Sequence, residues 1–195
     1  MKKVKGENLW VKAKTRNDKN RNGFKGEALS KVEKLLAKKD WKRARFLLQE
    51  ELLSEPMDHW LWMMLSLALY EERDYEKALL CSQRAVQLKP DCPLALWHYA
   101  GDLYITGHEP SALVIWNMLL DMDLETIAYG EDGEGMDWAL QLVNDVHYRI
   151  GRYYQWKGDD NLARESFKKY VHNRKRGVTS IYDLKKVEEF LCNSN

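Results

Sequence analysis

The sequence contains little glycine, little proline and few cysteines. Its 195 residues include 11 Gly and 4 Pro, and these lie mainly between periodic apolar stretches, which favours helices over a many-stranded sheet. The three cysteines, Cys81, Cys92 and Cys192, lack the paired C-x-x-C spacing of a zinc site or a disulfide framework, so we expect free thiols. The longest apolar stretch, near residues 60–68, is too short to cross a bilayer, and no signal-peptide-like run follows Met1. We therefore expect a helical, cytoplasmic protein.

The sequence also lacks the patterns that assemble an active site. The five histidines contain no H-E-x-x-H and no i, i+4 pair, and there is no G-x-G-x-x-G, Walker or nucleophile-elbow pattern. A calcium loop starting at Asp121 fails because Thr126 stands where glycine is required and Asp132 stands where a bidentate glutamate should close the loop. We therefore predict no enzymatic activity and no cofactor, with a hydrolase or a metal protein as the alternative.

Charge is distributed unevenly although the net charge is only +1. Residues 1–24 contain eight Lys or Arg against Glu7 and Asp18, a net +6, which leaves −5 for the remaining chain. This segment is basic, non-periodic and poor in apolar residues, which predicts a disordered arm. The arm is either a solubilising terminus or a segment that contacts nucleic acid or an acidic surface, for which Trp10 is the residue of interest.

A repeat with a period of about 34 residues organises the rest of the chain. Residues 59–92 read as two helices and a turn, with Trp62, Leu65, Ser66, Leu69, Tyr75, Ala78, Ser82, Ala85 and Pro90 at the signature positions. The segment Asp-Trp-Lys-Arg-Ala at 40–44 lies one period before Asp-Tyr-Glu-Lys-Ala at 74–78, and Pro56 lies one period before Pro90. On these residues the chain resembles the tetratricopeptide repeat family. The resemblance implies an all-α, right-handed α-solenoid of helix pairs that binds other chains and performs no chemistry itself.

The same period also predicts how the chain is divided. A one-residue deletion is expected in the turn of repeat three, where Trp97 and Gly101 take signature positions before Ala112. A long helix is expected from Met136, and Ser180 is expected to open a capping box for a last helix. The predicted parts are the arm at 1–24, repeats at 25–58, 59–92, 93–124 and 144–175 within a domain at 25–178, an acidic glycine-rich loop at 125–135, and a capping helix and tail at 179–195.

The resemblance implies a concave groove lined by the first helix of each pair, through positions two, five, nine and twelve. Among the residues that hold these positions in this sequence, eight are the candidate partner-binding residues: Trp60, Met63, Leu67, Tyr70, His98, Asp102, Tyr148 and Arg152. The first helix of repeat two is apolar on both its packing face and its groove face. Two explanations stay open: the groove face is buried within the chain, or it receives a partner helix or an extended peptide.

The function predicted from the sequence is a non-catalytic scaffold, adaptor or inhibitor that captures a protein partner in this groove. Chaperone-tail receptors of the family carry Lys, Arg and Asn where this chain has Met63 and Leu67, which argues against that partner class. The alternative is a nucleic-acid-associated regulator that uses the basic arm. If the groove face is a binding strip, Met63→Glu with Leu67→Glu should abolish capture and leave the fold intact.

Overall fold

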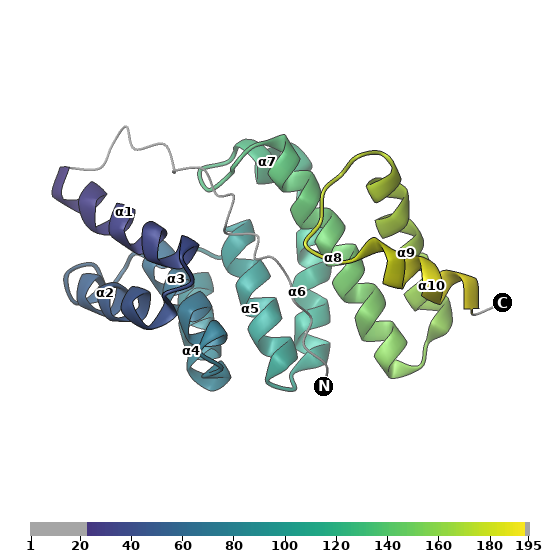
Figure 1. Ribbon diagram of the computed structural model, residues 1–195, viewed down its shortest axis with the longest axis horizontal. Coiled ribbons are helices and arrows are strands. Elements are labelled where there is room, and N and C mark those ends of the chain that lie inside the picture. The colour runs from purple at the N-terminus through teal and green to yellow at the C-terminus, as the bar shows by residue number, and fades with distance from the viewer. Residues whose placement is uncertain (1–22, 194–195) are drawn as a thin grey trace. The chain divides into compact units, whose positions relative to one another are not determined.

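A computed structural model of the protein describes residues 23–193 of the chain. The predicted arm at 1–24 therefore lies almost entirely outside the described residues. These residues form helices and no strand (Figure 1), and the bounds are α1 (Gly23–Ala37), α2 (Trp41–Ser54), α3 (His59–Glu71), α4 (Tyr75–Leu88), α5 (Pro93–Ile105), α6 (Glu109–Asp121), α7 (Leu124–Tyr129), α8 (Met136–Lys157), α9 (Asp160–Lys175) and α10 (Leu184–Asn193). The predicted all-α fold of consecutive helix pairs is confirmed. Across this described part of the chain, no helix is both long enough and apolar enough to span a membrane.

The chain divides into two compact units at the boundary between Ile115 and Trp116, within α6. In the unit that precedes this boundary, α1 packs on α2, α3 packs on α4, and α3 also contacts α2 and α5. In the unit that follows it, α8 packs against α7 and α9, and α10 packs on α9. Apart from the contact between α3 and α5, these contacts join helices that are consecutive in the chain, as expected for helices joined by short turns.

The same turn recurs between the two helices of each pair. The backbone N–H of the residue at the start of the second helix bonds a carbonyl five residues earlier, in Asp40 to Leu35, Asp74 to Leu69, His108 to Leu103 and Asp159 to Tyr154. The first three of these bonds follow one another at exact intervals of one period, and α5 begins and ends one period after α3. The deletion predicted in repeat three is therefore wrong, and the register runs unbroken from repeat one to repeat three.

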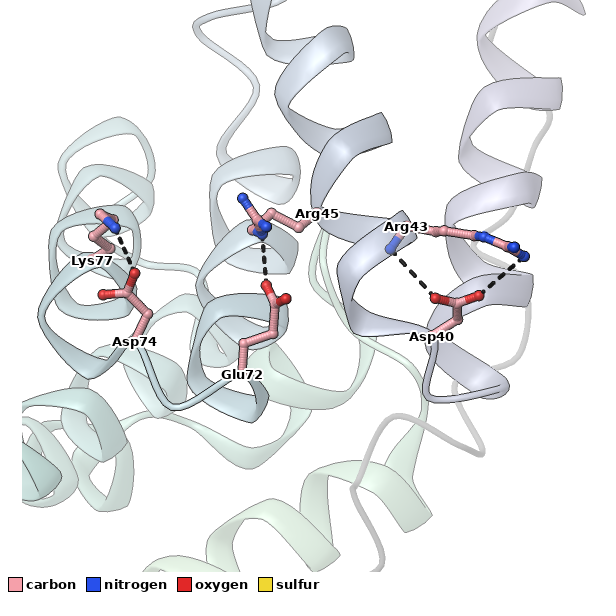
Figure 2. A network of polar contacts seen from close by, with 6 residues as sticks. All are labelled: Asp40, Arg43, Arg45, Glu72, Asp74 and Lys77. Carbon is pink, nitrogen blue, oxygen red and sulfur yellow. Dashed lines mark hydrogen bonds and ion pairs between the residues drawn. The ribbon is translucent and has the colours of Figure 1, made fainter.

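Aspartates at these turns also hold equivalent positions. Asp40 caps α2 by accepting a bond of 3.4 Å from the N–H of Arg43, whose guanidinium lies 3.4 Å from the same carboxylate. One repeat later, Asp74 pairs with Lys77 at 2.6 Å. Figure 2 shows both pairs on either side of an ion pair between Arg45 of α2 and Glu72. Carboxylates at a helix N-terminus satisfy its free N–H groups and interact favourably with its dipole.

Small residues set the close approach of paired helices. Ala44, Ala78 and Ala112 hold the same position in α2, α4 and α6, and all are fully buried. In α8, a Cβ added to Gly151 would lie 2.6 Å from the ring of Phe167 in α9, so only glycine allows this separation. These small residues allow the paired helices to pack closely.

Two segments differ from the predicted structure. The loop predicted over 125–135 begins with α7, because Asp123 caps this helix by accepting a bond of 2.8 Å from the N–H of Thr126 and because Ile127 and Ala128 are buried. The last helix begins at Leu184, where the Asp183 carboxylate accepts a bond of 3.0 Å from the N–H of Lys185. The capping box expected from Ser180 does not form.

Candidate functional site

The middle of α3 is buried on every side. Leu61 and all residues from 63 to 69 are buried, since α3 packs against α2, α4 and α5 and has apolar or small side chains around its whole circumference. Among the candidates in this helix, Met63 is 1% exposed and Leu67 is 4% exposed. Trp60 and Tyr70, at the two ends of the helix, are half-buried. The accessible part of the predicted strip in repeat two therefore consists of these two aromatic residues.

His98 and Asp102 lie inside the packed helices of their unit. Asp102, 2% exposed, accepts a hydrogen bond of 2.7 Å from the Ser66 hydroxyl of α3. Burial raises the pKa of Asp102 to about 6, partly offset by the nearby hydroxyls of Ser82 and Ser66, and burial lowers the pKa of His98 to about 3. The carboxylate thus links α5 to α3, and the imidazole is neutral at physiological pH.

The register of repeat three explains these two positions. With the period uninterrupted, the residues of α5 that correspond to Met63 and Leu67 are Trp97 and Gly101. The predicted deletion displaced the assignment by one residue, which moves a side chain by about 100° around a helix. His98 and Asp102 were therefore assigned to the groove face although they correspond to Met64 and Ala68, both buried.

The two candidates of repeat four differ in exposure. Tyr148 is buried, and its ring stacks on the ring of Tyr182 with 3.9 Å between centroids. Arg152, one turn further along α8, is exposed, and its guanidinium donates a bond of 2.7 Å to the Gln155 side chain. Arg152 is thus available to a partner, whereas Tyr148 contacts the C-terminal part of its own chain.

A repeated apolar surface on the second helices was missed by the sequence reasoning. Phe46 of α2, Leu80 of α4 and Val114 of α6 are 53%, 64% and 58% exposed and follow one another at intervals of one period. They follow the buried alanine of each helix by two residues and so hold one position of three consecutive repeats. That spacing is the signal that could have found them, because exposed apolar residues repeated in register are not expected from chance scatter.

Cys81 and His147 lack the properties of a nucleophile and a general base, respectively. Burial raises the pKa of the Cys81 thiol to about 12, with a further contribution from the Asp102 charge, so the reactive thiolate is scarce. Burial and, to a smaller extent, Lys169 lower the pKa of His147 to about 4. Cys81, Cys92 and Cys192 form no disulfide. Cys81 and Cys92 are buried, and Cys192 is exposed.

Consecutive helix pairs, each closed by the same turn bond and a buried alanine in the second helix, define a helical-repeat scaffold. The tetratricopeptide repeat family model matches residues 61–92, which confirms the resemblance for repeat two. Repeats of this family generally serve as protein-interaction scaffolds without catalytic activity of their own. No curated protein sequence matches the chain.

Two solved structures share the fold over most of this chain. A crystal structure of MamA superposes with a TM-score of 0.55 at 13% sequence identity and covers 83% of this chain and 90% of that chain. The MamA RS-1 ArsTM double mutant superposes with a TM-score of 0.50 at 18% identity and covers 80% of this chain and 97% of that chain. At these identities the likeness is one of fold, and it supports the all-α arrangement of helix pairs.

Proposed function

We propose that the protein is a non-catalytic cytoplasmic scaffold that captures a partner helix or an extended peptide in the groove lined by its first helices. The observation that carries the proposal is the partial exposure of Trp60 and Tyr70 at the two ends of α3, a helix whose interior residues are buried. Large aromatic side chains at the edge of a rigid apolar element are the residues that dominate binding energy at protein interfaces.

The eight candidate residues then divide into two groups by accessibility. Trp60 and Tyr70 contact the partner directly, and Arg152, in the other compact unit, provides a separate charged contact on α8. The buried candidates, Met63, Leu67, His98, Asp102 and Tyr148, hold the helices in place from within. Tyr70 is held for this role by edge-to-face packing on Tyr75 with centroids 5.3 Å apart. A rigid aromatic anchor loses little conformational entropy when it binds.

Photo-crosslinking in living cells tests which surface meets the partner. Benzoylphenylalanine is introduced at Trp60 or Tyr70 on the groove side, and at Phe46 as a matched aromatic position on the second helices. The proposal expects one protein to be crosslinked from both groove positions and not from Phe46. Crosslinking of that protein from Phe46 alone would place the binding surface on the second helices.

The captured partner then allows a quantitative measurement. Trp60→Ala is expected to weaken its affinity at least tenfold, because loss of an aromatic anchor costs about 2 kcal/mol or more. Leu53→Ala is the control, since Leu53 is 85% exposed and lies outside the groove positions. Equal losses for both variants would contradict a groove that is specific to α3.

The alternative drawn from the sequence is a nucleic-acid-associated role of the basic arm. It depends on residues 1–24, which fall almost entirely outside the described residues. It stays a prediction, with steep salt dependence of binding as its signature.

A further inference from the structure

The segment at residues 178–182, between α9 and α10, lies along one face of α8. The Thr179 hydroxyl donates a bond of 2.8 Å to the Gln141 side chain. The Ser180 hydroxyl and the backbone N–H of Ile181 both donate to the Asp145 carboxylate, the latter at 3.4 Å. Successive residues of the segment thus meet successive turns of α8, and the stacking of Tyr182 on Tyr148 continues the sequence. Figure 1 shows this segment returning from the end of α9 to α8 before α10 begins.

The backbone of the segment is bound from the side of α9. The Tyr170 hydroxyl donates a bond of 2.8 Å to the carbonyl of Tyr182 and lies 3.0 Å from the Ser180 hydroxyl. The Arg174 guanidinium donates a bond of 2.8 Å to the carbonyl of Val178. Tyr170 and Arg174 of α9 therefore bind two carbonyls of the segment, while α8 contacts three of its side chains and also accepts from one of its backbone N–H groups. A groove that recognises an extended peptide likewise combines bonds to main-chain groups with contacts to selected side chains.

The face that the segment covers is the one that the repeat assigns to a partner. The turn bond from Asp159 to Tyr154 fixes the register of repeat four, in which Asp145 and Tyr148 hold positions two and five. In repeat two these positions are Trp60 and Met63. Both Asp145 and Tyr148 are buried. The residues that contact them, Ser180 and Tyr182, are distant from them in sequence and lie outside α8.

We infer that residues 178–182 are an intramolecular ligand of the repeat-four groove and compete with an external peptide of the same chemistry. That peptide is extended and presents a serine or threonine hydroxyl, then an aliphatic residue, then an aromatic ring. The inference rests on the proposed function, because it names the ligand class and the regulation of one part of the groove. An empty groove would expose the Asp145 carboxylate and the Tyr148 ring together, which are the two groups that select this ligand.

The segment can leave the groove without loss of the last helix, because α10 has contacts of its own. Phe190 packs edge-on against Phe167 of α9, with centroids 5.3 Å apart, and the Arg164 guanidinium donates a bond of 3.1 Å to the carbonyl of Leu191. Gly177, with a φ of +94°, ends the preceding helix in a conformation that favours glycine. The segment is therefore tethered at both ends, and its effective concentration at the groove is of the order of millimolar.

The experiment uses the full chain and a fluorescein-labelled synthetic peptide with the sequence of residues 177–183, and it measures fluorescence anisotropy. The wild-type protein is expected to bind the peptide poorly because its own segment occupies the groove. Ser180→Ala removes a hydroxyl that bonds Asp145 and accepts from the N–H of Tyr182. This variant is expected to bind the peptide at least tenfold more tightly than wild type. Adding Asp145→Ala to it should abolish binding.

Two controls make the result decisive. Ser111→Ala, at an exposed position of α6, should behave as wild type, and a peptide with alanine in place of the serine should not bind. Hydrogen exchange of the Ile181 amide reports whether the segment has left the groove. If this exchange stays slow in Ser180→Ala, the segment is still bound, and the double variant Ser180→Ala with Tyr182→Ala is used instead. A released, folded variant that binds the peptide no more tightly than wild type overturns the inference. Photo-crosslinking at Trp60 is independent of this result, so the two proposals can fail separately.

Discussion

Asp102→Asn is expected to make the protein more stable at neutral pH. Asp102 is 2% exposed and accepts a hydrogen bond from Ser66. Asparagine has nearly the same size, and the Ser66 hydroxyl can rotate to donate to its carbonyl or to accept from its amide. The substitution therefore keeps the bond that joins α3 and α5 and removes only the ionisable group.

The sign and magnitude follow from the pKa of Asp102. Burial raises it from 3.8 to about 6, so the folded state holds this proton more tightly than the unfolded state does. The free energy of unfolding of the wild type consequently falls as pH rises from about 4 to about 6. A difference of about 2 pKa units at about 1.4 kcal/mol each corresponds to about 3 kcal/mol. The variant does not suffer this loss.

Urea denaturation of both proteins between pH 4 and pH 8 measures the effect. The difference in unfolding free energy, variant minus wild type, should rise by about 3 kcal/mol between pH 4 and pH 7 and then stay constant. His98, His147 and Asp145 titrate in both proteins, so their contributions cancel in this difference. A difference that does not change with pH would refute the reasoning, since Asp102 would then have the same pKa in the folded and unfolded states.

Two further substitutions test the packing of each unit. The double variant Met63→Glu with Leu67→Glu is expected to unfold the protein, because it places two charges in a packed interior and lowers the free energy of unfolding by more than about 4 kcal/mol. Circular dichroism should show a loss of helicity. The control Leu53→Glu, at an exposed site, should keep its helicity. Gly151→Ala is expected to lower the free energy of unfolding by about 1–3 kcal/mol in thermal or urea denaturation, because its Cβ would lie 2.6 Å from an aromatic ring. The control Gly101→Ala should be tolerated, because the added Cβ meets no atom within 4 Å.

The repeat spacing predicted most of the helices from the sequence. Residues 59–92, expected to form two helices and a turn, contain α3 and α4, and the long helix expected from Met136 is α8. These predictions succeed because a turn aspartate, a buried alanine and a terminating proline recur together, and each has a local physical role. Six-residue α7 was missed because a helix of that length shows too little periodicity, although the Asp123 cap is visible in the sequence.

The register of repeat three could not be predicted because two adjacent residues both fit the signature. Leu96 and Trp97 are both buried, at 2% and 8% exposure, so apolar character does not distinguish them. Repeat two has Trp62 at the signature position, and this favours aligning Trp97 with it, which displaces the register by one residue. Only the turn bond from His108 to Leu103 resolves the choice, and it depends on backbone geometry.

The candidate site shows why a face assigned from register need not be a free surface. Position five of repeat four predicted Tyr148 to meet an extended partner, and its ring is indeed stacked on an aromatic residue, Tyr182, but that residue belongs to the same chain. Residues 178–182, which cover Tyr148, show no helical periodicity in the sequence. Their Ser180 donates a hydrogen bond to Asp145, which lies 35 residues earlier in the chain. The sequence predicts a helix cap for Ser180, and its bond to Asp145 emerges only from the structure. The chemistry of a groove and the chemistry of the segment that fills it must match, so the contacts at Asp145 and Tyr148 define both the intramolecular ligand and the external peptide that could replace it.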